Sequence, residues 1–66
     1  MSIVLNGRET DYLAGSTVAD VVADICDSDR GVAVARSREI IPRSTWSQVE
    51  LAHGDVLEVL TAAAGG

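Results

Sequence analysis

The two glycines that end the sequence, Gly65 and Gly66, are the residues best suited to do chemistry. Their carboxylate follows three alanines at 62–64. Because glycine has no Cβ, an extended Gly-Gly end can enter a channel too narrow for any side chain, where a partner enzyme could reach the terminal carbonyl carbon. The alternative is a terminus that simply frays. Gly66 is therefore the candidate reactive residue, and Gly65 gives the clearance for threading.

Few other side chains offer chemistry. Cys26 is the one cysteine, which excludes an internal disulfide, and with His53 as the one histidine a metal site would lack ligands. The sequence has no lysine, which excludes a P-loop lysine, a Schiff base and branching through a side-chain amine. We expect Cys26 to be a small core or rim residue and His53 an exposed turn residue.

The length of 66 residues allows one domain with a thin core. A domain of this size hides only about 60% of the surface of its unfolded chain. A deep catalytic cavity would remove apolar contacts from a fold with about 3–5 kcal/mol of stability. We therefore do not expect an independent enzyme.

The charge balance favours protein partners. Ten acidic residues against five arginines give a net charge of −5, without the basic cluster that nucleic acid requires. An acidic surface suits docking onto basic enzyme surfaces. No apolar run approaches the roughly 20 residues that cross a bilayer. The sequence opens with a strand-like segment and no basic, apolar leader, so we expect a cytoplasmic protein with no membrane partner.

The elements that must position the glycines begin with a β-hairpin. Ser2–Leu5 is typical of a strand, Asn6-Gly7 of a two-residue turn, and Arg8–Leu13 of the returning strand. Thr17, with Asp20 three residues later, then predicts a capping box at the start of a helix. The helix should present one apolar face, formed by Val18, Val21, Val22 and Ile25.

The second half of the sequence indicates three more strands. Val32–Ala35 suits an interior strand, and after a Ser37-Arg38 turn Glu39–Ile41 should form a short one, because Pro42 cannot donate to a sheet ladder. Ser44 could cap a single helical turn that runs to Gln48. Trp46 should cover the core with its indole N–H at the rim.

The last predicted strand, Val56–Thr61, has Leu57 and Val59 on one face and Glu58 on the other. The order β-β-α-β-β-β, with one helix to cover one face of a mixed sheet of about five strands, outlines an α+β, β-grasp (ubiquitin-like) fold. The domain would span 1–61, and a flexible tail, 62–66, would leave the end of a strand inside the sheet. Five residues at 3.3–3.6 Å each give the tail a reach of about 17 Å.

At this level of detail the sequence resembles the ThiS family, the sulfur-carrier proteins of thiamine biosynthesis, over essentially its whole length. The order and spacing of six segments carry the resemblance: Ile3–Gly7, Gly15–Val18, Val32–Ala35, Ile41–Trp46, Leu51–Asp55 and the terminal Gly65-Gly66. Two departures are the absence of phenylalanine and of a second cysteine.

The resemblance implies a function for the tail. In proteins similar to this one, a ThiF-type, E1-like adenylyltransferase adenylates the terminal glycine with ATP. The glycine then becomes a thiocarboxylate, with a persulfide as sulfur donor, and gives its sulfur to thiazole synthase. Gly66 would carry the sulfur as a covalent thiocarboxylate. The resemblance thus implies a carrier that is a co-substrate of partner enzymes, has no bound cofactor and is not itself an enzyme. Arg43 and Asp55 are weaker candidates for partner recognition, since both residues could simply satisfy turns.

Other classes remain open. Another β-grasp sulfur carrier, of the molybdopterin synthase small-subunit type or for cysteine or tRNA thiolation, would have the same tail, although molybdopterin-type subunits usually run longer and carry phenylalanines. A ubiquitin-like protein modifier would attach through the same glycine. An acyl carrier, suggested by Asp27-Ser28, conflicts with Asp29 where leucine is needed and with the strand pattern. A β-grasp binding module with an inert tail would function without Gly65 and Gly66.

Overall fold

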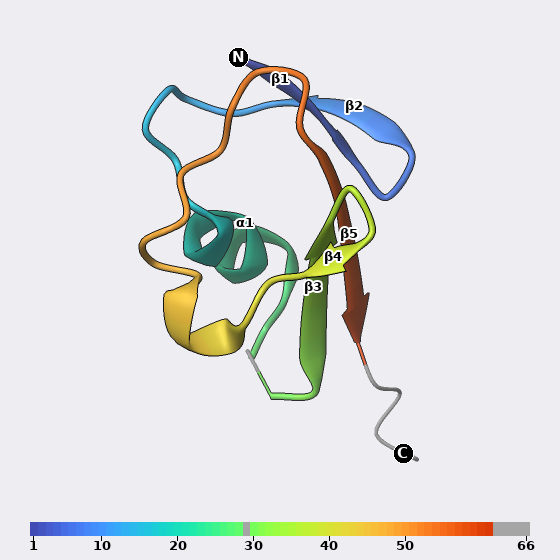
Figure 1. The fold of residues 1–66 in the computed structure, drawn as a ribbon, viewed down its shortest axis with the longest axis vertical. Coiled ribbons are helices and arrows are strands. Elements are labelled where there is room, and N and C mark those ends of the chain that lie inside the picture. The colour runs from blue at the N-terminus through green and yellow to red at the C-terminus, as the bar shows by residue number, and fades with distance from the viewer. Residues whose placement is uncertain (29, 62–66) are drawn as a thin grey trace.

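The computed structural model describes residues 1–28 and 30–61. Its elements follow one another in the predicted order (Figure 1). They are β1 (Ser2–Leu5), β2 (Arg8–Asp11), α1 (Val18–Ile25), β3 (Val32–Arg36), β4 (Glu39–Ile40), the 3₁₀ helix η1 (Arg43–Thr45) and β5 (Val56–Thr61).

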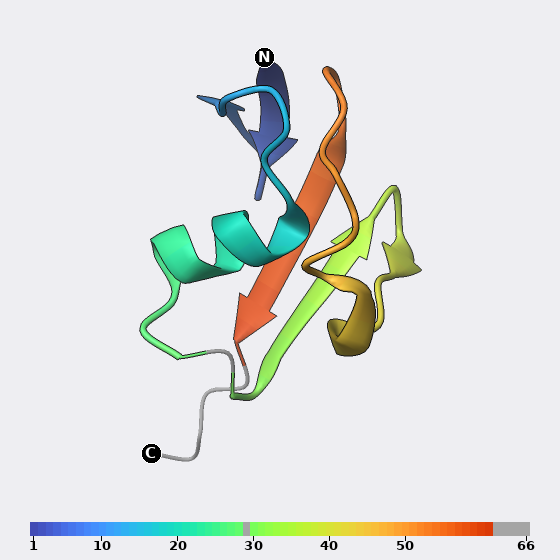
Figure 2. The same cartoon turned by 90° about the vertical axis from the view of Figure 1, so that its left-hand side faces the viewer.

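The five strands form one mixed sheet in the order β2-β1-β5-β3-β4. β5 runs parallel to β1 and antiparallel to β3, and each outer pair is an antiparallel hairpin. Helix α1 lies across one face of this sheet (Figure 1, Figure 2). This is the expected β-grasp arrangement, and it places the last strand at the centre of the sheet.

The first hairpin turns at Asn6 and Gly7, whose φ angles of 50° and 82° are both positive. That combination defines the type I′ turn that matches the twist of two flanking strands. β2 ends at Asp11 rather than at Leu13 as predicted. Tyr12 still exchanges two 2.9 Å hydrogen bonds with Met1, but Leu13 is 83% exposed and has left the sheet.

The predicted capping box of α1 is confirmed. The Thr17 hydroxyl accepts a bond from the Asp20 N–H (3.3 Å), and the Asp20 carboxylate accepts one from the Thr17 N–H (2.8 Å). These bonds satisfy two of the donors that every helix leaves unpaired at its N-terminus. An eight-residue helix is too short to be stable alone, so its stability also depends on packing.

The apolar face of α1 is shorter than predicted. Val18, Val21 and Val22 are buried, but Ile25 is 43% exposed. Ile25 has the right angular position, yet it lies seven residues, or about 10 Å, along the helix axis from Val18. It therefore extends past the core at the last turn, and Cys26 packs against the core instead, as a half-buried residue.

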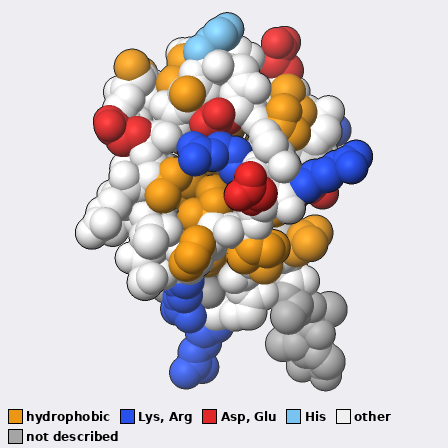
Figure 3. All heavy atoms as spheres, in the orientation of Figure 1, with side chains coloured by type: hydrophobic (Ala, Val, Ile, Leu, Met, Phe, Trp, Pro, Cys, Tyr) orange, Lys and Arg blue, Asp and Glu red, His pale blue; other side chains and the backbone are white. Residues whose placement is uncertain are grey.

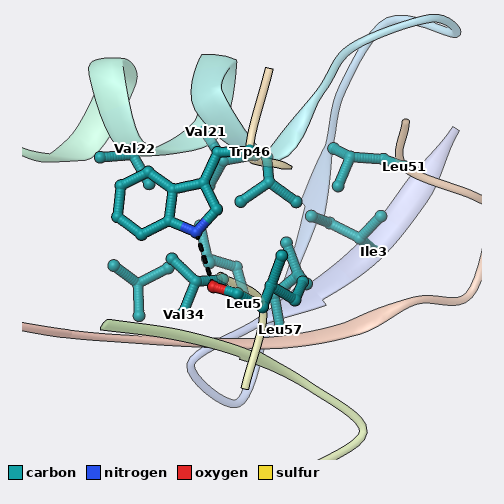
Figure 4. Close-up of a cluster of buried hydrophobic side chains, with 11 residues drawn as sticks. Ile3, Leu5, Val21, Val22, Val34, Trp46, Leu51 and Leu57 are labelled. Atoms are coloured by element: carbon teal, nitrogen blue, oxygen red, sulfur yellow. Dashed lines mark hydrogen bonds between the residues drawn. The ribbon is translucent and has the colours of Figure 1, made fainter. Parts of the chain in front are cut away.

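The turn after β4 also differs from the prediction. Ser44 does not cap it: the 3₁₀ helix begins after Pro42, whose carbonyl accepts bonds from the Thr45 N–H (2.9 Å) and the Thr45 hydroxyl (2.7 Å). The fixed φ of proline favours the start of such a turn. Trp46 covers the core as expected, but its indole N–H is buried rather than at the rim, and it donates to the Ile41 carbonyl (2.9 Å; Figure 4).

The core lies between α1, η1 and the inner face of the sheet. Side chains from the three central strands meet the helix there, and Trp46 closes one side (Figure 4). The buried apolar residues are Ile3, Leu5, Val18, Val21, Val22, Val34, Ile41, Trp46, Leu51, Leu57 and Val59.

Candidate functional site

The two glycines predicted to do the chemistry, Gly65 and Gly66, lie outside the described residues, together with the rest of 62–66. The structure does describe the strand that leads to them. β5 ends at Thr61, one residue before this segment, at the end of the sheet far from the β1 N-terminus (Figure 1). The site is therefore described through the strand that carries it.

β5 pairs with β3 along most of one edge, pairs with β1 only at the start of the other edge, and packs one face against the core. Leu57 to Thr61 pair with β3, and Val56 and Leu57 pair with β1. Leu57 is fully buried and Val59 nearly so, while Glu58 and Leu60 face the other way and are exposed, as their alternation predicted. The chain thus leaves the centre of the sheet from a fixed base rather than from a loose edge.

Asn6 is the residue near this base that the sequence did not reveal. Its side-chain amide donates to the Val59 carbonyl (3.2 Å), and its side-chain oxygen accepts from the Val59 N–H (2.8 Å). The turn already accounts for an asparagine before Gly7, so no local signal indicated a second contact 53 residues away.

Asp55 closes the turn that precedes β5. Its carboxylate accepts a bond from the Ala52 N–H (2.8 Å), and its N–H donates to the Ala52 carbonyl (3.0 Å). The same carboxylate lies 3.7 Å from the Arg36 guanidinium. The structure therefore gives Asp55 a turn-closing role, and its predicted role in partner recognition stays a prediction.

Asp55 also borders a surface hollow beside β4. Hydrophobic side chains gather there beneath basic and acidic ones, in the middle of the face seen in Figure 3. Its lining residues are Arg36, Ser37, Glu39, Ile40, Ile41, Pro42, Thr45, Val49 and Asp55. Arg43, the second predicted recognition residue, is exposed at the start of η1 and does not line this hollow. The structure does not bring Arg43 and Asp55 into one site.

His53 and the potential metal-ligating side chains form no further site in the described residues 1–28 and 30–61. His53 is exposed in its turn, as predicted, and its Nδ1 accepts a bond from the Ser2 N–H (3.1 Å). Within residues 1–28 and 30–61, no three His, Cys, Asp or Glu side chains cluster as metal ligands would. No helix in the same part of the chain is long and apolar enough to span a membrane.

Tyr12 has a perturbed acidity. Its pKa is raised by partial burial first, and then by the hydrogen bond and the negative charge of Asp24, whose carboxylate accepts from the phenol (3.1 Å). All three causes favour the neutral phenol over the phenolate. The pair joins the end of the first hairpin to α1.

Comparison with known proteins agrees with this geometry. Residues 3–66 match the ThiS family. This chain belongs to the ThiS family. It is 30% identical to the sulfur carrier protein ThiS of Escherichia coli (strain K12) over 66 residues, the full length of both chains. It is 32% identical to the sulfur carrier protein ThiS of Bacillus subtilis (strain 168) over 63 residues, which cover 94% of this chain and 96% of that one.

A longer protein and a solved structure are also similar to this chain. All 66 residues of this ThiS-family chain are 38% identical to part of a thiazole synthase of Paramagnetospirillum magneticum, of which they span 20%. The crystal structure of the thiamine biosynthesis protein ThiS from Geobacter metallireducens superposes with a TM-score of 0.81 at 20% identity, over the whole of both chains. The fold predicted from the sequence is thereby confirmed.

Proposed function

We propose that this ThiS-family protein is a sulfur carrier for thiamine biosynthesis, and that Gly66 carries the sulfur as a thiocarboxylate. The observation that supports the proposal most is full-length similarity to two sulfur carrier proteins, combined with a diglycine end. The position of β5 at the centre of the sheet suits the role, because it gives the tail a rigid base.

The chemistry explains why the carrier needs an activating partner. A carboxylate is a poor electrophile, since its charge is delocalised and its leaving group would be oxide. A ThiF-type, E1-like enzyme would therefore join the Gly66 carboxylate to the AMP moiety of ATP and release pyrophosphate. The terminal sulfur of a persulfide donor would attack the carbonyl carbon, AMP would leave, and a thiol would cleave the remaining S–S bond to give the thiocarboxylate.

Thiazole synthase is the proposed acceptor of the sulfur. The similarity of this chain to a segment of a thiazole synthase supports that partner, because it places a ThiS-like sequence in the same polypeptide as the acceptor enzyme. A thiocarboxylate is a soft nucleophile that can attack a carbonyl or imine without releasing free sulfide. The carrier would supply delivery and recognition, while the partner enzymes would supply catalysis.

Growth complementation tests the pathway. In a bacterial strain that lacks its own ThiS, the chain should restore growth without thiamine, and a version that ends at Ala64 should not. Ala63→Gly is the matched control, because it changes the tail but keeps both terminal glycines, and it should restore growth. Rescue by the version without Gly65 and Gly66 would contradict the proposal, as would rescue of a molybdopterin-deficient strain alone.

A further inference from the structure

β5 continues well past the end of its parallel neighbour. β1 pairs with it at Val4 and Leu5, and the ladder closes with a bond from the Asn6 N–H to the Leu57 carbonyl (2.9 Å). β1 then turns away, whereas β5 runs on to Thr61 (Figure 2). The half of β5 nearest the tail therefore lacks a backbone partner from β1.

Main-chain groups alternate in direction along β5, and this alternation shows which of its N–H and C=O groups lack a partner on β1. The Ser37 N–H donates to the Val56 carbonyl (3.0 Å), so the main-chain groups of Val56 point toward β3. Those of Leu57 and Val59 point the opposite way, toward β1, because main-chain groups alternate along a strand. Val59 is the first such residue beyond the reach of the β1 main chain.

The Asn6 side chain supplies both missing partners. Its oxygen and nitrogen take the Val59 N–H and carbonyl at 2.8 and 3.2 Å, as an additional strand residue would. Asn6 is itself fixed on both sides, by the ladder bond to Leu57 and by the tight turn with Gly7. The turn alone would accept glycine in place of asparagine. The amide group is thus needed for the contact with Val59 and not for the turn.

We infer that Asn6 is a positioning residue for the carrier tail: its side-chain amide holds Val59 and so fixes the last residues of β5, Leu60 and Thr61, to which the tail is joined. The inference rests on the proposed function. Only Leu60 and Thr61 lie between Val59 and the tail segment 62–66. A reacting group must be held in near-attack geometry by its partner, so a loosened base lowers the rate of reaction after docking.

Three variants separate this role from a turn effect. Asn6→Gly keeps a residue that accepts positive φ but removes both side-chain bonds, whereas Asn6→Asp keeps the acceptor and loses the donor. Ser37→Gly is the matched control, because Ser37 has the same φ of 50° in the other hairpin, at the opposite end of β5. Two quantities are measured: amide hydrogen exchange of Val59 in the free protein, and thiocarboxylate formation with a ThiF-type enzyme, ATP and a persulfide donor.

We expect the Val59 amide to exchange about tenfold faster in Asn6→Gly than in wild type, from the loss of two hydrogen bonds, and to be intermediate in Asn6→Asp. At saturating carrier the rate of thiocarboxylate formation should fall in the same order, by about tenfold for Asn6→Gly. The dissociation constant for the enzyme without ATP should change little, because docking of the folded domain does not depend on the tail direction. Ser37→Gly should match wild type in every measurement.

Two results would overturn the inference. In the first, the Val59 amide of Asn6→Gly exchanges no faster than that of Ser37→Gly. In the second, the Val59 amide of Asn6→Gly exchanges faster, but thiocarboxylate forms at the wild-type rate at saturating carrier. If Asn6→Gly does not fold, the comparison of Asn6→Asp with Ser37→Gly decides the question. A wild-type chain that gains no sulfur would instead reject the proposed function, and Val59 exchange would still report on the Asn6 contact.

Discussion

Asp55 offers a test that separates a structural role from partner recognition. Its carboxylate makes two contacts of different kinds: a short hydrogen bond with the Ala52 N–H (2.8 Å) and a longer ion pair with Arg36 (3.7 Å). The Arg36 side chain is 40% exposed, and an exposed ion pair contributes between zero and about 1 kcal/mol. The turn hydrogen bond should contribute about 1 kcal/mol.

Two substitutions divide these contacts. Asp55→Ala removes both and should lower the free energy of unfolding by about 1–2 kcal/mol. Asp55→Asn keeps an oxygen for the Ala52 N–H and loses the charge, so its cost should stay below about 1 kcal/mol. Arg36→Gln removes the same ion pair from the other side and should match Asp55→Asn. In a domain of this size, 1 kcal/mol corresponds to a shift in Tm of about 4–8 °C.

The assay is urea denaturation followed by Trp46 fluorescence, with thiocarboxylate formation measured on the same variants. We expect Asp55→Asn to form the thiocarboxylate at the wild-type rate, because the turn accounts for the contacts of this residue. Equal destabilisation by Asp55→Asn and Asp55→Ala would refute the importance of the turn bond. A normally stable Asp55→Asn that reacts slowly would show that the carboxylate recognises a partner.

Three other predictions concern the fold. Thr17→Ala removes the side-chain cap of α1 and should cost about 1 kcal/mol in urea denaturation, while the solvent-facing Ser47→Ala should cost little. Because the pKa of Tyr12 is raised from its ordinary 10.0 by burial and by Asp24, stability should hold up to about pH 10 and fall as the pH rises through the folded pKa. Tyr12→Phe should reduce that fall, and a fall as large in the variant as in the wild type would contradict the assignment. Trp46→Phe leaves the buried Ile41 carbonyl without its donor and should lower the free energy of unfolding, measured by circular dichroism, by about 2–3 kcal/mol. A loss of less than about 0.5 kcal/mol would contradict the importance of that bond.

Local patterns in the sequence were enough to predict much of the fold. The capping box depends on Thr17 and Asp20, which are three positions apart, and it is confirmed. The alternation depends on the consecutive residues Leu57, Glu58 and Val59, and it is also confirmed. The order of such elements indicated the β-grasp arrangement, because a single helix can cover only one face of so small a sheet.

The errors arose where distant parts of the chain decide the outcome. Ile25 has the right helical spacing, but the extent of the sheet beneath it determines burial, and helical spacing does not report that extent. Burial of the Trp46 indole N–H depends on how the loop after η1 folds over α1, where the Trp46 carbonyl accepts a bond from the Ala19 N–H (3.1 Å). The start of η1 after Pro42 is the exception, because it follows from the fixed φ of that proline. The contact between Asn6 and Val59 joins opposite ends of the chain, and nothing near either residue indicates it.

The most direct test of the account is intact-protein mass spectrometry, after incubation of the chain with ATP, a ThiF-type enzyme and a persulfide sulfur donor, followed by fragmentation of the tail. The account predicts that one oxygen is exchanged for sulfur and that the change maps to Gly66. An unchanged mass, with partner enzymes shown to be active on a known carrier, would contradict it.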